Sequence, residues 1–411
     1  MKANYLYIIM GFVWAGMMAC TEEVPNMQME EEASRIYLSA GVGGRVSSRA
    51  PYYYKEGENV LTTPTVEHPL DVSVWASTTA GAYPNSELNG STGTVAIHTN
   101  AYFQSGNPQL LGKAIYPQKG QNGQHPSVYF VGLHPQSENW STPEDDYSKA
   151  LYTFTGMEDV MFAPQISGTY GTDFNNSPTF HFYHLLTWLR IEMAVDKYMQ
   201  KEEGEEEKDI TLKKDAIRQA WGQIESMTIS SKNQVVVDLT QLVHPDSTAL
   251  PAGVATFRED SASFYFYQTG TDNVFPATEG SDIPIDETEV AYVMCAPVDA
   301  VYKASVQGYD ENILIPEYTL TLKTRNRNEM TIPIDLKINS GTEESSYFKG
   351  STMGKQFTIL LNFKMGNVIS VAADISLAAD TEWFTHGTGT SELEEEHFVE
   401  NENNTTNQPT E

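Results

Sequence analysis

The sequence is poor in cysteine and in basic residues. Two cysteines among 411 residues exclude a disulfide scaffold and a four-cysteine zinc site. Lysine and arginine number 25 against 55 aspartate and glutamate residues, so the formal charge is −30 and we expect no nucleic-acid partner. The hydrophobic share of 40% and the aromatic share of 11% exclude a wholly disordered chain, and the length suggests two or three domains.

Motifs that carry chemistry are also missing. The chain has no nucleophile elbow, no HExxH, no phosphate-binding glycine loop and no CxxC. His181 and His184 are three residues apart, a spacing that points to opposite faces of a strand, so they are not expected to share a metal ion. Cys295 lies in the apolar run 291–296 and reads as a buried thiol. We therefore expect a non-enzymatic protein without cofactor or metal. A secreted hydrolase with scattered carboxylates is the least favoured alternative.

The first twenty residues indicate export. Lys2 precedes an uncharged run from Tyr5 to Ala19, and a helix of that length, roughly 23 Å, is shorter than the roughly 30 Å hydrocarbon core of a bilayer. The run has the length of a signal-peptide apolar region, and residues 17–20, MMAC, resemble a bacterial lipobox with Cys20 as the lipidated residue. Residues 1–19 are thus predicted to be a lipoprotein signal peptide. The alternative is an ordinary secretory signal with a chance cysteine.

Residues 20–34 are predicted to be an acidic tether. They contain Glu22-Glu23 and Glu30-Glu31-Glu32, and a flexible acidic leader would hold the folded body away from an anionic membrane surface. An acidic cluster at this place also resembles the signal that sends Bacteroides-type lipoproteins to the outer leaflet. We therefore expect an outer-membrane, lipid-anchored protein at the cell surface.

Beyond the tether the apolar residues mostly alternate with polar ones, which is typical of strands. The run 179–195 is longer, and its parity changes near His184-Leu185, which suggests a bulge or a crossing between sheets. One short helix is predicted over 211–221, and residues 79–125 and 270–288 read as long polar loops. The other expected strands are 36–38, 71–76, 127–131, 159–162, 226–230, 234–239, 263–268, 290–298, 317–323, 329–336, 356–363 and 368–377.

These strands fall into two groups, so the fold class is predicted to be all-β, with two tandem β-sandwich domains of transthyretin-like or Greek-key type. The domains are expected at 35–196 and 211–384, separated by an acidic linker at 197–210. Residues 385–411 read as a disordered acidic tail.

Five segments, in order, resemble the fimbrillin-like family of Bacteroides-type lipoproteins, the subunits of type V pili and their relatives. Each is an expected strand with one or two residues that resemble the family's pattern, and together the segments span about residues 36–383. The segments are an early strand with a following Arg-containing stretch (36–49), VSVWA (72–76), YFVGLHP (129–135), DVMFA with FHFYHL (159–163 and 180–185), and GKQFTI with the final strand that closes in DTEW (354–359 and 380–383).

The resemblance implies a lipoprotein that assembles into a fimbrium by strand exchange with other pilus subunits. An arginine-specific protease would first remove the N-terminal strand, and Arg35, Arg45 and Arg49 are the candidate cleavage sites. Arg49 is favoured because it follows a Ser- and Gly-rich stretch; the alternative is that all three are ordinary surface arginines. The acidic tail lacks the alternating apolar residues of a donor strand, so stalk, tip and anchor roles all stay open.

A second hypothesis is a surface glycan-binding lipoprotein that recognises a host or bacterial glycan or protein. It depends on the aromatic residues Tyr83, Tyr102 and Trp140, which lie in stretches that read as loops; packing inside the loop is the alternative. Ser247 and Ser261 lie in DST and DSA, which resemble the O-glycosylation pattern of the same bacterial group.

Overall fold

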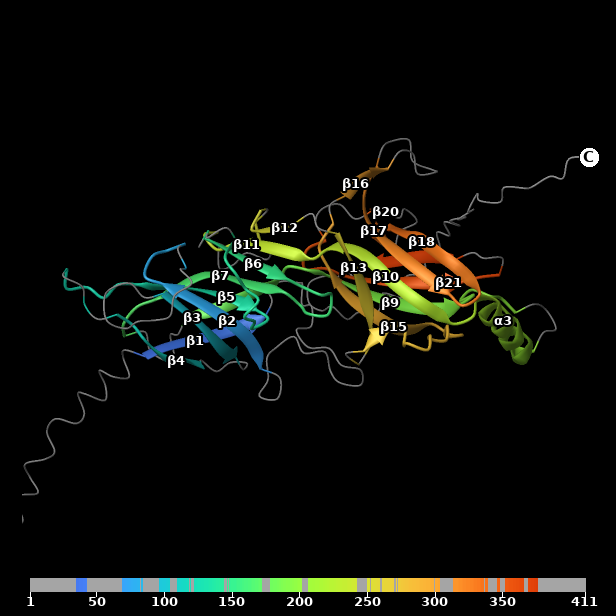
Figure 1. Ribbon diagram of the computed structural model, residues 1–411, viewed down its shortest axis with the longest axis horizontal. Helices are drawn as coiled ribbons and strands as arrows, with labels where there is room; N and C mark the ends of the chain where they lie inside the picture. The colour runs from blue at the N-terminus through green and yellow to red at the C-terminus, as the bar shows by residue number, and fades with distance from the viewer. Residues whose placement is uncertain are drawn as a thin grey trace, which may run out of the picture.

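The computed structural model describes residues between 35 and 375, and its longest gaps are 43–68, 84–95, 242–249, 304–312 and 339–345. Nearly every element in this part of the chain is a strand, so the predicted all-β class is confirmed. The molecule is elongated, with one sheet at each end of its long axis (Figure 1).

The first sheet has seven strands in the order β3-β2-β5-β7-β8-β1-β4. Its inner face carries a core of aliphatic and aromatic side chains that includes Val72, Val74 and Phe130. The strands are β1 (Arg35–Val42), β2 (Leu70–Ser77), β3 (Ala96–Phe103), β4 (Gln109–Ile115), β5 (Val128–His134), β7 (Met161–Gly168) and β8 (Thr179–His184).

The second sheet follows the order β16-β17-β10-β13-β15-β9-β21-β22, with β14 paired to β13 and β18 paired to β17. Most neighbours are antiparallel, but β21 runs parallel to β9. The strands are β9 (Thr187–Val195), β10 (Ile224–Lys232), β13 (Ser261–Gln268), β14 (Val274–Phe275), β15 (Thr288–Cys295), β16 (Ala300–Lys303), β17 (Ile313–Thr324), β18 (Arg327–Asp335), β21 (Gln356–Phe363) and β22 (Ile369–Ile375).

A three-stranded sheet joins the two halves. It contains β6 (Lys149–Thr153), β11 (Gln234–Asp238) and β12 (Ala255–Phe257), and it pairs a segment that precedes β7 with segments that follow β10. The two-stranded sheet of β19 (Lys337–Ile338) and β20 (Ser346–Tyr347) lies farther along the chain.

One hydrophobic cluster runs through both halves. Trp75 and Leu133, on strands of the first sheet, belong to the same cluster as Leu189 and Phe264 of the second. Successive residues of β2 alternate between the two cores, because Val74 joins the first-sheet core while Trp75 joins the shared cluster. The two halves are therefore continuous in their packing.

The chain passes from the first sheet to the second between His184, where β8 ends, and Thr187, where β9 begins. This is where the sequence predicted a parity change, and the sheet crossing is confirmed. The sequence predicts that the first domain ends at residue 196. Strand β9 (187–195), which lies before that boundary, pairs with β15 and β21 of the second sheet.

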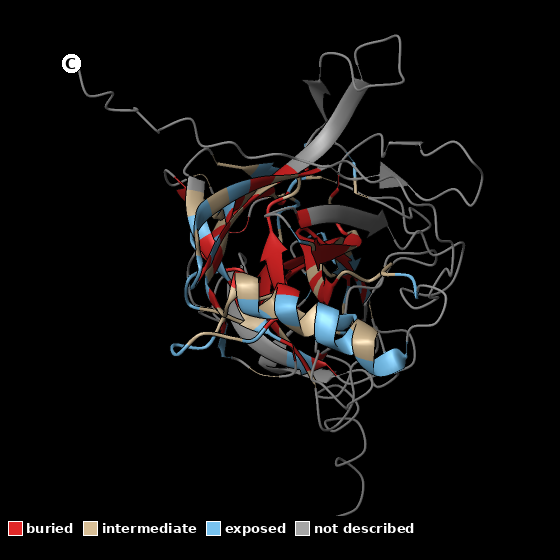
Figure 2. Ribbon diagram, turned by 90° about the vertical axis from the view of Figure 1, so that its right-hand side faces the viewer, coloured by how far each residue is buried: buried red, intermediate tan, exposed pale blue. Residues whose placement is uncertain are grey.

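The helix within the described residues is α3 (Glu207–Trp221), so the predicted helix is confirmed, with an earlier start. It begins where Glu206 and Asp209 form a capping box, which satisfies otherwise unpaired N–H groups of the first turn. Ile217 and Trp221 are buried, and the helix lies across the end of the second half with much of its outer side exposed (Figure 2). Among the described residues no helix has the length and apolarity to cross a membrane.

The prediction of one long loop over 79–125 was wrong, because β3 and β4 lie within it. Both are outer strands of the first sheet, and β3 carries His98, Thr99 and Asn100 in its middle, which hides the alternation. In the second expected loop, 270–288, the structure adds only the two residues of β14 and the first of β15.

Candidate functional site

The N-terminal strand β1 lies inside the first sheet, between β8 and β4. It runs parallel to β8, with Ser39 opposite Thr179 and Ala40 opposite Phe180, and antiparallel to β4, with Leu38 opposite Gln109. Both backbone edges of β1 are thus used in pairing. A strand so placed can leave only if its hydrogen bonds on both sides are broken.

The inward side chains of β1 are small or aliphatic and are buried. Ile36 and Leu38 have no exposed surface, and Ala40 is 8% exposed. They belong to the same core cluster as Phe180 and Phe182 of β8, whose ring centroids are 5.7 Å apart. The site that β1 occupies is therefore an apolar groove lined by aromatic rings, and we call it the β1 groove.

Polar contacts fix the register of β1 against β8. The Ser39 N–H donates to the Pro178 carbonyl oxygen at 3.0 Å, and the hydroxyl groups of Ser39 and Thr179 are 2.6 Å apart. Ser39 alternates with the buried residues and so faces away from the core. The inward face of β1 therefore packs in the core, and the outward face makes the polar contacts that fix its register.

The three candidate cleavage sites differ in their relation to β1. Arg35 is the first residue of the strand and pairs with Ile115 of β4. Arg45 and Arg49 come after the strand and lie outside the described residues, as does Cys20. Only a cut after Arg45 or Arg49 would separate β1 from the rest of the domain.

Of the two candidate glycosylation sites, Ser261 lies in the described part of the chain. Ser247 lies outside the described residues. Ser261 begins β13, and its backbone pairs with Lys232 of β10. Glycosylation at these serines stays a prediction.

The two histidines of the HxxH motif point in opposite directions, as predicted. His181 is exposed, whereas His184 is 4% exposed and its Nδ1 is 2.6 Å from Asp159 Oδ2. Within the described part of the chain, no group of three or more His, Cys, Asp or Glu side chains could hold a metal ion. The buried His184 thus forms a pair with Asp159.

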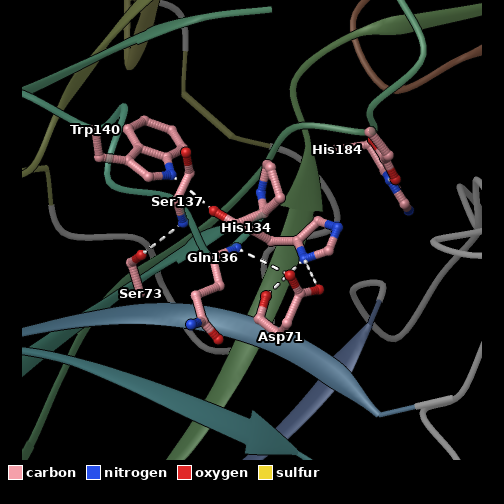
Figure 3. A network of polar contacts seen from close by, with 9 residues as sticks. Asp71, Ser73, His134, Gln136, Ser137, Trp140 and His184 are labelled. Carbon is pink, nitrogen blue, oxygen red and sulfur yellow. Dashed lines mark hydrogen bonds and ion pairs between the residues drawn. The ribbon is translucent and has the colours of Figure 1, made fainter.

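His134, which precedes a cis proline, is buried and makes a second His–Asp contact, with an aspartate whose side chain is 38% exposed. Its Nδ1 is 2.7 Å from the Asp71 carbonyl oxygen and 3.2 Å from Asp71 Oδ1. Asp71 also accepts the Gln136 N–H at 3.2 Å, so it ties the turn after β5 to the start of β2 (Figure 3). The His-Pro sequence predicts a turn role for His134 but not its acidic partner, because Asp71 is 63 residues away and neighbours it only in the folded sheet.

Electrostatics at this contact favour the charged pair. Burial works against the imidazolium of His134, but the hydrogen bond and negative charge of Asp71 outweigh it and raise the pKa of His134. Burial likewise acts to raise the pKa of Asp71, while the contact with His134 lowers it, and the net shift is downward. Both pKa shifts favour the charged forms, the imidazolium of His134 and the carboxylate of Asp71.

The loop aromatic residues divide sharply by exposure. Tyr83 is 1% and Trp140 is 3% exposed, and the Trp140 indole N–H donates to the Pro135 carbonyl oxygen at 2.8 Å. Tyr102, on β3, is 55% exposed. Trp140 therefore packs inside the protein, and of these three only Tyr102 is available at the surface to contact a ligand.

Cys295 is buried without a disulfide partner, which confirms the predicted core thiol. Burial is the main cause of the raised pKa of its thiol. A thiol of this kind stays protonated at neutral pH and is a poor nucleophile.

No protein-family model and no curated protein matches the chain. Solved structures similar to it include a candidate cell adhesion protein from Bacteroides ovatus, with 14% identity, 85% of this chain and 98% of that chain covered, and a TM-score of 0.40. A candidate cell adhesion protein from Bacteroides uniformis has 13% identity, coverage of 84% and 97%, and a TM-score of 0.39. A fimbrial protein from Bacteroides vulgatus has 13% identity, coverage of 85% and 100%, and a TM-score of 0.36.

Proposed function

We propose that the protein is a surface-exposed lipoprotein that acts as a structural or accessory subunit of a type V pilus and contributes to cell adhesion. Cys20 would carry the lipid anchor in the outer membrane. Assembly would proceed by strand exchange after proteolysis. The observation that carries the proposal is the burial of β1 between β8 and β4, directly before the segment that contains Arg45 and Arg49.

Loss of β1 would leave the domain with a defect that another strand can fill. The facing edges of β8 and β4 would have unpaired N–H and C=O groups, and the β1 groove would lose the side chains of Ile36 and Leu38. Each fully buried aliphatic side chain contributes about 1.5–3 kcal/mol. An extended strand from a neighbouring subunit, with apolar residues at alternate positions, would restore both the pairing and the packing.

The position of β1 distinguishes the three candidate cleavage sites. A cut after Arg35 would leave Ile36 to Val42 attached to the domain, so the groove would stay filled. A cut after Arg45 or Arg49 would free the whole strand. We therefore assign processing to Arg49 or Arg45 and not to Arg35.

The test is mild digestion of purified residues 21–411 with an arginine-specific protease. Intact mass locates the cut, and size exclusion together with unboiled gel electrophoresis reports assembly. We expect cleavage after Arg45 or Arg49, followed by detergent-resistant oligomers. The double variant Arg45→Lys and Arg49→Lys should stay monomeric, whereas the matched control Arg35→Lys should assemble like the parent.

The outcomes separate the parts of the proposal. Cleavage without self-assembly indicates an accessory or tip subunit, because such a subunit need not pair with its own kind. Oligomers from an uncut chain, or no cut at Arg45 and Arg49 under conditions that leave the fold intact, would overturn assembly by strand removal.

A further inference from the structure

The β1 groove differs in character along its length. Strand β8 begins opposite Ser39, so Ile36 and Leu38 lie before its first residue. Ala40 is opposite the second residue of β8, Phe180. All three inward side chains of β1 are buried in one core cluster. The two large aliphatic side chains therefore lie at one end of the groove, and the smallest one lies beside an aromatic ring at the other.

The ring of Phe180 is held on two sides. Its centroid is 6.0 Å from that of Phe103 on β3 and 5.7 Å from that of Phe182 on β8. None of the three side chains has exposed surface. Protein interiors are close-packed, so a ring enclosed in this way has no free space into which it could move. The place of Ala40 therefore has no room for a larger side chain.

The ring of Phe182 is itself fixed by a glycine. A side-chain carbon added at Gly132 would lie 2.7 Å from Phe182 Cζ, so this ring reaches across β7 to β5. So close an approach is possible only because Gly132 has no Cβ. With Phe182 confined on that side, Phe180 keeps its position beside Ala40.

We propose that the β1 groove selects its strand by the order of side-chain sizes. The strand must carry large aliphatic residues at the places of Ile36 and Leu38, and a residue no larger than alanine at the place of Ala40. A larger residue beside Phe180 would overpack the core, and alanine at the place of Leu38 would leave a cavity. Such selection presupposes the strand exchange proposed above and specifies the kind of strand that can enter.

The same order fixes the register of the strand. A slip of one residue would turn the apolar side chains outward, and it would also separate the hydroxyl groups of Ser39 and Thr179, which are 2.6 Å apart. A slip of two residues keeps the apolar side chains inward, so the alternating pattern alone does not prevent it. It would, however, place Leu38 beside Phe180, and the size limit excludes that arrangement.

The size limit is tested first in the uncut chain, where strand exchange plays no part. Ala40→Leu should lower the folding equilibrium constant, measured by urea denaturation, by roughly tenfold. In a Phe180→Leu background the same change should lower it by much less, because the smaller residue leaves room. The control is Ile36→Leu, which keeps the volume of a buried side chain on the same strand and should not respond to Phe180→Leu. Ala40→Val and Phe180→Met are the milder changes if either variant fails to fold.

The second test is peptide exchange into the full chain cut by the arginine-specific protease, in urea below the unfolding midpoint. The peptide has the sequence of residues 36–44 and a fluorophore at its C-terminus. It should enter the groove and elute with the protein in size exclusion. The matched control is the isomeric peptide that combines Leu38→Ala with Ala40→Leu. It has the same composition and should bind at least roughly tenfold more weakly.

The two tests separate the selection rule from strand exchange itself. Size selection is overturned if positions 40 and 180 show no coupling in the uncut chain, or if the isomeric peptides bind equally, and strand exchange would then remain. If neither peptide enters the cut chain although the two positions are coupled in the uncut chain, strand exchange at this groove is overturned. The proposed function then falls, and the size limit describes only how β1 packs in its own domain.

Discussion

His184 Nδ1 lies 2.6 Å from Asp159 Oδ2, and both side chains are buried where the chain leaves the first sheet for the second. The backbone repeats the contact, because the Leu185 N–H donates to the Val160 carbonyl oxygen at 2.8 Å. Across the first sheet, His184 of β8 is opposite Met161 of β7, and Met161 is opposite His134 of β5. The pair thus fixes the crossing between the two halves.

Replacing Asp159 with alanine should leave Nδ1 of the buried His184 without its hydrogen-bond partner. We expect a loss of about 1–3 kcal/mol in the free energy of unfolding, measured by urea denaturation. The control is His181→Ala, whose side chain is exposed and should change stability by less than about 0.5 kcal/mol. Equal effects from the two variants would mean that the buried pair adds nothing to stability.

The Asp71–His134 pair should make stability depend on pH. The pKa of His134 is raised above 6.5, so its contribution is complete below pH 6.5 and is lost as the pH rises through the folded-state value. The pKa of Asp71 is lowered below 3.8, so its contribution is present above pH 3.8 and is lost as the pH falls through the folded-state value. The pair should stabilise most between these limits.

The check is the difference in unfolding free energy between the parent and His134→Gln, measured at pH 5.5 and at pH 8.5. We expect the parent's advantage to be larger at pH 5.5. A difference that is constant, or that grows toward pH 8.5, would show that His134 is held by its shape and neutral hydrogen bond alone.

Leu38→Ala should show how much the first core depends on β1. Truncating a buried leucine costs about 2–5 kcal/mol in the free energy of unfolding. The neighbouring control Ser39→Ala removes one hydroxyl contact and should cost about 0.5–1.5 kcal/mol. Calorimetry of the uncut chain measures both, and a Leu38→Ala effect no larger than the control would contradict the packing of β1.

Cys295 should report opening of the second half. Its thiol is fully buried and its pKa is raised by that burial, so a chain lacking residues 1–20 should not react with a thiol reagent in native buffer at pH 8. One equivalent should react in high urea, where the thiol is solvated. Rapid labelling in native buffer would mean that β15 opens locally without global unfolding.

The sequence predicted strands best where inward residues are large and outward residues are polar. In β5 and β21 the alternation or continuous apolar run is unmistakable, and both strands were located correctly. The prediction failed at the edge strands β3 and β4, because polar residues occupy the middle of β3 and Gly112-Lys113 interrupt the apolar residues of β4. The acidic run after Val195 predicts a domain boundary, and β9 before it pairs in the second sheet.

By itself the sequence determined the all-β class, the helix at α3, the opposite orientations of His181 and His184, and the buried thiol. Each of these follows from a local period or from one side chain's polarity. The tertiary structure alone decided which strands flank β1, which acidic residue meets each buried histidine, and that Trp140 is covered while Tyr102 is not. Those outcomes depend on pairings between segments tens to hundreds of residues apart, such as Asp71 with His134 and Ser39 with Thr179. Packing across such separations leaves no period in the chain.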